Sequence, residues 1–144
     1  MEFIYSDGGR SNYYDAKKVG DCVVRAIANA TGKDYKEIYD GINELAKSER
    51  IGKRKKKISS SRNGVYTQTA KKYIEDVLKW KWHPCMKIGS GCTTHLKKDE
   101  LPNGKLIVNL SKHFSCVKDG VLYDTFDCSR NEKRCVYGYW KENI

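Results

Sequence analysis

The sequence lacks the features that mark several classes of protein. It has no run of roughly 18 apolar residues, so nothing in it predicts a membrane span. Its first residues are not a basic region followed by an apolar core, and we therefore expect no secretory signal. A glycine-rich phosphate-binding loop and an internal repeat are also absent. These absences favour a cytoplasmic protein without a cofactor.

Cysteine is present, but not in a metal-binding pattern. The six cysteines are Cys22, Cys85, Cys92, Cys116, Cys128 and Cys135. No two of them form a Cys-x-x-Cys pair, and the nearest zinc-like group is Cys85, Cys92 and His95, with irregular spacing and no partner pair. Because cytoplasmic thiols are kept reduced, we expect no disulfides. The sequence therefore predicts neither a metal site nor a disulfide framework.

The chain has the size and element order of one layered domain. Its 144 residues suit a single domain spanning 1–144. Apolar residues at helical spacing predict helices within residues 20–32, 34–46 and 67–78. The period then changes, and strands are predicted near residues 80–84, 105–110, 113–118, 121–126 and 134–140. This order predicts an α+β fold in which N-terminal helices pack on a C-terminal antiparallel β-sheet.

Cys22 lies where the first predicted helix begins. Asp21 precedes it as a helix-capping acid, and Gly32 ends the segment. Backbone N–H groups that are unpaired in a first helical turn, together with the positive end of the helix dipole, stabilise a thiolate there. The alternative is a small buried core residue, because Cys22 lies at the margin of the helix's apolar stripe. Cys22 is thus a candidate nucleophile.

A β-hairpin in the second half supplies a histidine and an acid. Two apolar runs separated by Asp119 and Gly120 predict a type I′ turn. The resulting register pairs Lys118 with Val121, Ser115 with Asp124 and His113 with Phe126. Asp124 then lies diagonal to His113 on one face, at the roughly 7–8 Å backbone separation across which a carboxylate can reach an imidazole. Asp127 is the competing acid, but it lies beyond the paired region.

Cys22, His113 and Asp124 supply, in this order, a nucleophile, a base and a group that orients the base. With this order and the segment GDCVVRA at residues 20–26, the sequence resembles the papain-like cysteine peptidase superfamily, and within it the compact phage and bacterial members similar to bacteriocin-leader peptidases. The resemblance spans residues 22–140. It implies a papain-like fold and an enzyme of bacterial or phage origin that acts in the bacterial or host cytoplasm.

One expected part of such a site is missing from the sequence. Papain-like peptidases usually carry a glutamine or another amide a few residues before the cysteine, where it helps the cysteine N–H to bind the oxyanion. The only glutamine here is Gln68, and Asn12 is the nearest upstream amide and a weak substitute. An oxyanion donor contributes several kcal/mol to acyl transfer, so this group has to come from elsewhere.

Positive charge is concentrated in one segment. Residues 47–62 hold eight basic residues and one acid, a net charge of +7 out of the chain's +10. The segment lacks helical or strand periodicity, and residues 47–64 are predicted to form a mobile surface loop between two helices. It is either a solvated loop or a surface for nucleic acid or an acidic partner. The basic residues at its centre are Lys53, Arg54, Lys55, Lys56 and Lys57.

The sequence as a whole predicts a cysteine peptidase or a related thiol hydrolase. His113 would deprotonate Cys22, Asp124 would orient His113, and the reaction would pass through a thioester. An acyl transferase or a deamidase would use the same intermediate. The alternative is a non-catalytic binding protein on the same fold that contacts nucleic acid or an acidic partner through the basic loop. The loops at residues 87–94 and 128–133 are the predicted walls of the cleft.

Overall fold

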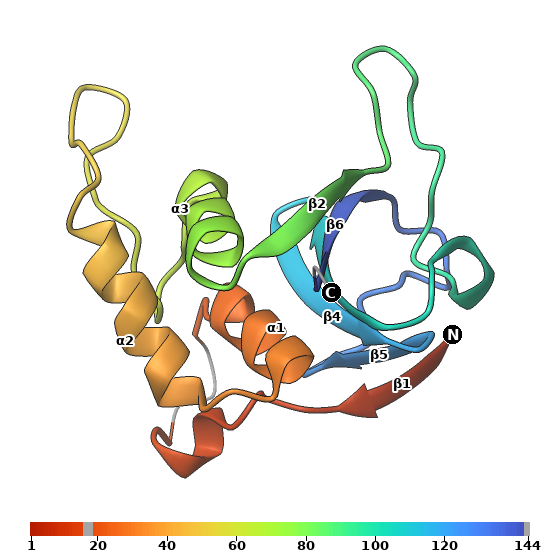
Figure 1. Ribbon diagram of the computed structural model, residues 1–144, viewed down its shortest axis with the longest axis horizontal. Helices are drawn as coiled ribbons and strands as arrows, with labels where there is room; N and C mark the ends of the chain where they lie inside the picture. The colour runs from red at the N-terminus through yellow and green to blue at the C-terminus, as the bar shows by residue number, and fades with distance from the viewer. Residues whose placement is uncertain (16–18, 143–144) are drawn as a thin grey trace.

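The computed structural model describes residues 1–15 and 19–142. The fold is α+β, with three α-helices and a six-stranded mixed sheet (Figure 1). The helices are α1 (Cys22–Thr31), α2 (Tyr35–Ala46) and α3 (Thr67–Lys72). The strands are β1 (Glu2–Tyr5), β2 (Trp80–Pro84), β3 (Lys105–Leu110), β4 (His113–Lys118), β5 (Val121–Asp124) and β6 (Val136–Glu142).

The helices follow the apolar periodicity, but their ends differ from the prediction. α1 ends at Gly32, whose left-handed backbone (φ 72°) directs its N–H to the carbonyl of Ala28. α2 begins after Asp34, whose carboxylate makes no capping hydrogen bond and instead accepts the hydroxyl of Tyr13. The third helix was predicted to continue to residue 78. Its α-helical part ends at residue 72, and a π-helical turn, Tyr73–Val77, follows.

The sheet is mixed, so the predicted antiparallel sheet is wrong at one edge. Its strand order is β1-β5-β4-β3-β6-β2. β1 pairs with β5 in parallel, whereas the other strand pairs are antiparallel. β1 was not predicted, because a four-residue strand is too short to show a period of two.

The hairpin between β4 and β5 has the predicted turn. Asp119 (φ 49°) and Gly120 (φ 79°) both have positive φ, as a type I′ turn requires, and Lys118 pairs with Val121. The ladder is shorter than predicted and stops at the pair of Cys116 and Tyr123. Asp124 is therefore the last residue of β5, at the point where the strand leaves the sheet.

Two core clusters fix the position of the helices and the hairpin. The first joins side chains of α1 and α2 to side chains of β4 and β6, including Ile27, Ile38, Phe114 and Trp140. The second contains buried residues of β3, β4, β5 and β6, including Leu106 and Leu122. Burying each such side chain contributes about 1.5–3 kcal/mol. The first cluster brings the start of α1 close to the start of β4.

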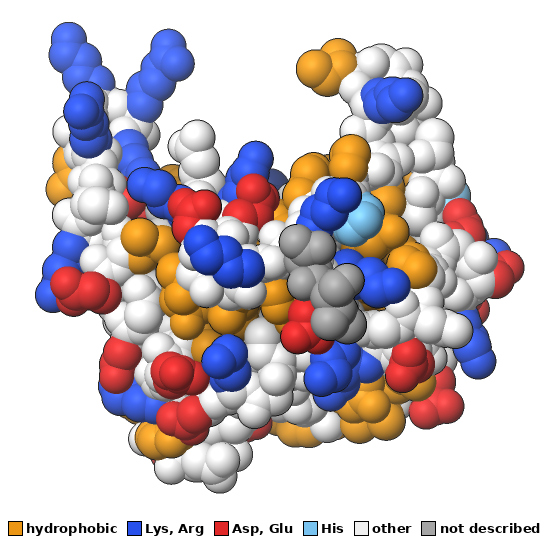
Figure 2. All heavy atoms as spheres, in the orientation of Figure 1, with side chains coloured by type: hydrophobic (Ala, Val, Ile, Leu, Met, Phe, Trp, Pro, Cys, Tyr) orange, Lys and Arg blue, Asp and Glu red, His pale blue; other side chains and the backbone are white. Residues whose placement is uncertain are grey.

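The basic loop between α2 and α3 is attached to the fold at its base. Glu49 accepts the N–H of Ser59 (2.8 Å), pairs with Lys55 (3.1 Å) and accepts the hydroxyl of Thr69. The hydroxyl of Ser61 donates to the carbonyl of Tyr39 (2.6 Å). The lysine and arginine side chains of the basic loop project from one end of the molecule (Figure 2). The one acid of the segment, together with Ser61, therefore attaches the loop to the helices.

Two further predictions concern cysteine and membranes. Cys92 and Cys135 form a disulfide (Cα–Cα 5.8 Å), so the expectation of fully reduced thiols is wrong. An isolated antiparallel β-bridge between His95 and Cys135 brings Cys92 close to Cys135. The two cysteines are 43 residues apart in the chain, and their spacing in the sequence does not indicate this pairing.

Within residues 1–15 and 19–142, none of the helices has the length and apolar character needed to cross a membrane.

Candidate active site

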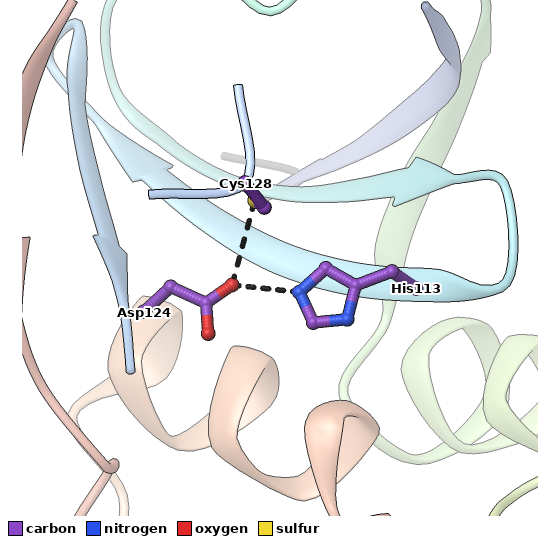
Figure 3. A group of neighbouring side chains, drawn as sticks. All are labelled: His113, Asp124 and Cys128. Carbon is purple, nitrogen blue, oxygen red and sulfur yellow. Dashed lines mark hydrogen bonds and ion pairs between the residues drawn. The ribbon is translucent and has the colours of Figure 1, made fainter. Parts of the chain in front are cut away.

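The three candidate catalytic residues lie at the ends of three elements that meet. Cys22 is the first residue of α1, His113 is the first residue of β4, and Asp124 is the last residue of β5. The Nε2 atom of His113 lies 2.7 Å from Oδ2 of Asp124, and both side chains are almost completely buried (Figure 3). This interaction leaves the Nδ1 atom of the imidazole for a second partner.

Cys22 lines the same cavity as His113, and the ionisation of each residue depends on the other. Burial raises the pKa of Cys22, but hydrogen bonds with His113 and with the Phe114 backbone, and the nearby charges of His113 and Arg25, outweigh burial and bring this pKa below its ordinary value. Burial conversely lowers the pKa of His113, but hydrogen bonds with Asp124, Cys128 and Cys22 raise it to about 11. Opposite shifts of this kind favour a thiolate beside an imidazolium.

Asp124 is held by several donors besides the histidine. Its Oδ2 accepts the hydroxyl of Ser115 (2.7 Å), and its Oδ1 accepts the N–H of Thr125 (2.6 Å) and a guanidinium N–H of Arg25 (3.3 Å). Although burial raises its pKa, the hydrogen bonds with His113 and Ser115 and the charge of His113 lower that pKa to about 2. Asp124 is therefore ionised and fixed in orientation at neutral pH.

Asp127, the competing acid, is used elsewhere. Its Oδ1 accepts the N–H (3.0 Å) and the hydroxyl (2.7 Å) of Ser129. The ring of Phe126, predicted to lie opposite His113, has its centroid 5.3 Å from the imidazole centroid. Of the two candidate acids, Asp124 is the one that the hairpin brings to His113.

A buried ionic network behind these residues was not predicted. Asp21 occupies the N-cap position of α1, as predicted, but its carboxylate makes no helix-capping hydrogen bond. Its carboxylate is buried and accepts guanidinium groups of Arg10 (3.0 Å) and Arg25 as well as the hydroxyl of Tyr35 (2.7 Å). Arg25 thus bridges Asp21 to Asp124. The only sequence signal was an acid and a base four residues apart in an otherwise apolar helix.

Cys22 and His113 line one surface cavity of about 300 Å³. Its other lining residues are Gly20, Val23, Asn63, Gly64, Val65, Thr67, Asn109, Leu110, Lys112 and Phe114. The walls therefore come from the end of the basic loop and from the β3–β4 hairpin. Residues 87–94 and 128–133, the predicted walls, do not line this cavity, and neither does Asn12.

Two amides that the sequence analysis did not single out reach the cavity, namely Asn63 and Asn109. Asn63 also lies against the residue that precedes Asp21: a Cβ built on Gly20 would meet the Asn63 carbonyl oxygen at 2.8 Å. Glycine at position 20 thus permits the loop to approach the start of α1. No local sequence pattern indicates this contact, because the two segments are far apart in the chain.

One group of side chains has the composition of a metal site. Ligand atoms of His113, Asp124 and Cys128 lie within 4.8 Å of one another (Figure 3). The imidazole Nε2 and the carboxylate Oδ2 of this group already bind each other. Among the zinc-like residues weighed from the sequence, Cys92 is bonded to Cys135, and His95 pairs with Glu100 (3.2 Å).

Comparison with known proteins adds no relative. No protein-family model matches the chain, and no significant match is found among curated proteins or among solved structures. The argument for function therefore rests on the arrangement of the side chains.

Proposed function

We propose that this protein is a thiol hydrolase of the papain-like type that acts as a cysteine peptidase. One observation carries the proposal: His113 is hydrogen-bonded through Nε2 to the ionised Asp124, and it shares a cavity with Cys22, whose pKa it lowers. The arrangement joins a nucleophile, a base and a group that orients the base beside one open cavity.

The chemistry follows from these groups. The Cys22 thiolate attacks the carbonyl carbon of a substrate amide, and a C–S bond forms as the carbonyl becomes an oxyanion. His113 donates its proton to the departing amine, the C–N bond breaks, and a thioester remains. His113 then takes a proton from water, the hydroxide attacks the thioester, and the acid and the thiol are released. Asp124 keeps the imidazole oriented and stabilises its charged form.

The oxyanion needs donors besides the backbone N–H of Cys22. Asn63 is the better candidate for the side-chain donor because its backbone lies against Gly20, two residues before the nucleophile. Asn109 lines the same cavity from β3 and is the alternative. Such a donor contributes about 3–4 kcal/mol of transition-state stabilisation.

The substrate that intercepts the thioester decides the reaction class. If water attacks the thioester, the protein is a peptidase, and if an amine attacks it, the protein is an acyl transferase. If the Cys22 thiolate forms the thioester with a glutamine side chain and water then hydrolyses it, the protein is a deamidase. The open cavity, with walls on two sides of the thiol, suits an extended peptide.

The test is the rate of Cys22 alkylation by iodoacetamide against pH, read by peptide mass spectrometry. We expect Cys22 to react well below the ordinary thiol pKa of about 8.5, and His113→Ala to abolish this advantage. Cys85 is an internal control because it is also a partly exposed free thiol, and burial raises its pKa. A Cys22 that titrates like Cys85 in both proteins would contradict the proposal.

A second candidate function is a non-catalytic binding protein that contacts nucleic acid or an acidic partner through residues 47–64. The observation in its favour is that Lys53, Arg54, Lys56 and Lys57 are exposed, and none of them has an ion-pair partner among the described residues. Binding of this kind weakens steeply with salt, whereas the alkylation of Cys22 follows the ionisation of the thiol.

A further inference from the structure

The basic loop and the candidate active site meet at a shared wall. A second cavity, of about 480 Å³, is lined by Lys57, Ile58, Ser60, Asn63, Gly64, Val65 and Tyr66. Residues 63–65 also line the cavity that holds Cys22 and His113. The loop thus extends from the basic segment directly to the side of the nucleophile.

The shared wall is open at Gly64. A Cβ built on this glycine would meet no other atom within 4 Å, so the space above residue 64 is free. A chain bound next to Cys22 therefore has a route over Gly64 into the second cavity. The backbone here has φ 141°, a conformation that disfavours a side chain.

The charged side chains along this route, apart from Cys22 and His113, are two lysines. Lys57 lines the second cavity, and Lys112 lines the first, and neither cavity is lined by an acid among the described residues. The other cations of the loop differ from Lys57. Lys55 is bound to Glu49, and Lys53, Arg54 and Lys56 line neither cavity.

The lining is better suited to a peptide than to a nucleic acid. Single-stranded nucleic acids are bound by open aromatic faces on which bases stack. Here Tyr66, which is 45% exposed and has the Lys55 ammonium 4.3 Å from its ring centroid, is a single such ring, and Phe114 is buried against Trp140, so the lining offers no series of stacking faces. The two asparagine amides can instead bind the carbonyl and N–H groups of a peptide backbone.

From this juxtaposition we infer that the substrate is a peptide segment with acidic side chains on both sides of the reacting carbonyl, lying across Gly64 between Lys57 and Lys112. This inference rests on the proposed function and specifies its substrate class. The lysines bind the acidic side chains, and the opposite charge also raises the rate of encounter.

The experiment uses the Cys22→Ala protein, which keeps the groove but does not turn substrate over. Binding of a labelled glutamate-rich peptide, its glutamine analogue and a single-stranded oligonucleotide of equal charge is measured by fluorescence anisotropy. Two variants carry the same loss of charge: Lys57→Gln with Lys112→Gln along the route, and Lys53→Gln with Arg54→Gln outside both cavities.

We expect the glutamate peptide to bind about three- to tenfold more tightly than the glutamine analogue, as one or two exposed ion pairs supply. The Lys57 and Lys112 changes should remove this preference, while the Lys53 and Arg54 changes should alter affinity less than about twofold. High salt should abolish the preference.

Three outcomes would overturn the inference. One is equal binding of the two peptides, and another is an equal loss in both double variants, which would indicate diffuse attraction to the loop. The third is tighter binding of the oligonucleotide, which would favour nucleic acid as the partner. Each is distinct from a failure of the proposed function, which is read from Cys22 alkylation in the unaltered protein.

Discussion

A guanidinium N–H of Arg25 donates to Oδ1 of Asp124 at 3.3 Å, although the two residues are 99 positions apart in the chain. Arg25 lies about one turn after Cys22 on the same helix, so α1 carries both the candidate nucleophile and the group that binds the acid. The same guanidinium binds Asp21, and all three side chains are buried. The network ties the orientation of the acid to the position of the thiol.

Replacing Arg25 with glutamine should destabilise the fold, because it leaves Asp21 and Asp124 buried without their shared cation. We expect a loss of about 3–5 kcal/mol in the free energy of unfolding, measured with denaturant. Arg25→Lys keeps the charge and should lose less. Lys47→Gln, which breaks an exposed pair with Glu44 (2.9 Å), is the control and should cost about 1 kcal/mol or less. Equal losses of unfolding free energy in the two glutamine variants would show that the buried network stabilises the fold no more than an exposed ion pair does.

Asparagine at position 124 should change the pH dependence of the thiol, whereas asparagine at position 127 should not. The lowered pKa of Cys22 places the acid limb of its reaction below about pH 8.5, and the raised pKa of His113, about 11, keeps the imidazolium charged across neutral pH. Asp124→Asn removes the partner that raises the His113 pKa. The imidazolium is then lost at lower pH, and the pKa of Cys22 rises.

The measurement for this pair of variants is the alkylation rate of Cys22 against pH, followed by peptide hydrolysis. Asp124→Asn should reduce hydrolysis by about a hundredfold or more, the usual size of a general acid–base contribution. Asp127→Asn should retain the parent profile because Asp127 binds Ser129 rather than His113. A larger effect of Asp127→Asn than of Asp124→Asn would mean that Asp127, and not Asp124, is the acid that orients His113.

Truncating Asn63 should lower turnover without changing the alkylation of Cys22. We expect Asn63→Ala to reduce kcat by about a hundred- to a thousandfold, since an oxyanion donor acts only on the transition state. Asn109→Ala is the matched change on the other side of the cavity and should have the smaller effect. The reverse ranking would make Asn109 the donor, and a change in KM alone would exclude both residues from this role.

Neutralising Glu49 should release the basic loop. Burial raises the pKa of Glu49, but hydrogen bonds with Ser59, Thr69 and Lys55 lower it to about 2. Because the folded-state pKa lies below the ordinary value, the stabilisation is complete above about pH 4.5 and is lost as the pH falls towards 2. Glu49→Gln should reproduce this loss at neutral pH.

Hydrogen exchange of residues 50–59 checks the prediction for the loop. The exchange should become faster in Glu49→Gln and remain unchanged in Glu44→Gln, which removes an exposed carboxylate paired only with Lys47. Unaltered protection of the loop in both variants would mean that the contacts of Ser61 and the loop backbone suffice to hold it.

The local parts of the fold and the site could be predicted from the sequence, and the long-range parts could not. The turn at Asp119 and Gly120 sets the hairpin register through adjacent residues, and that register brings Asp124 to His113. Asp21 was misread because a helix cap and a buried ion pair begin with the same residue type at the same position. Only the tertiary contacts with Arg10, Arg25 and Tyr35 distinguish them.

The cavity and the loops could not be predicted either, because they too depend on contacts between segments that are distant in the chain. The contact of Asn63 with Gly20 depends on how the basic loop folds back over the start of α1. The attachment of that loop through Glu49 was hidden because a single acid in a basic run carries no periodicity. The disulfide likewise depends on the pairing of His95 with Cys135, which no local pattern encodes.

The placement of Cys22 at the start of α1 and of its partners on β4 and β5 also bears on the synthesis of the protein. The thiol leaves the ribosome 91 residues before His113 and 102 residues before Asp124, and closing so long a loop is slow compared with forming a helix. Until the hairpin joins the sheet, Cys22 lacks the hydrogen bonds with His113 and the Phe114 backbone that lower its pKa. A partly synthesised chain therefore carries an unactivated thiol, and activation of Cys22 reports that the C-terminal half has folded.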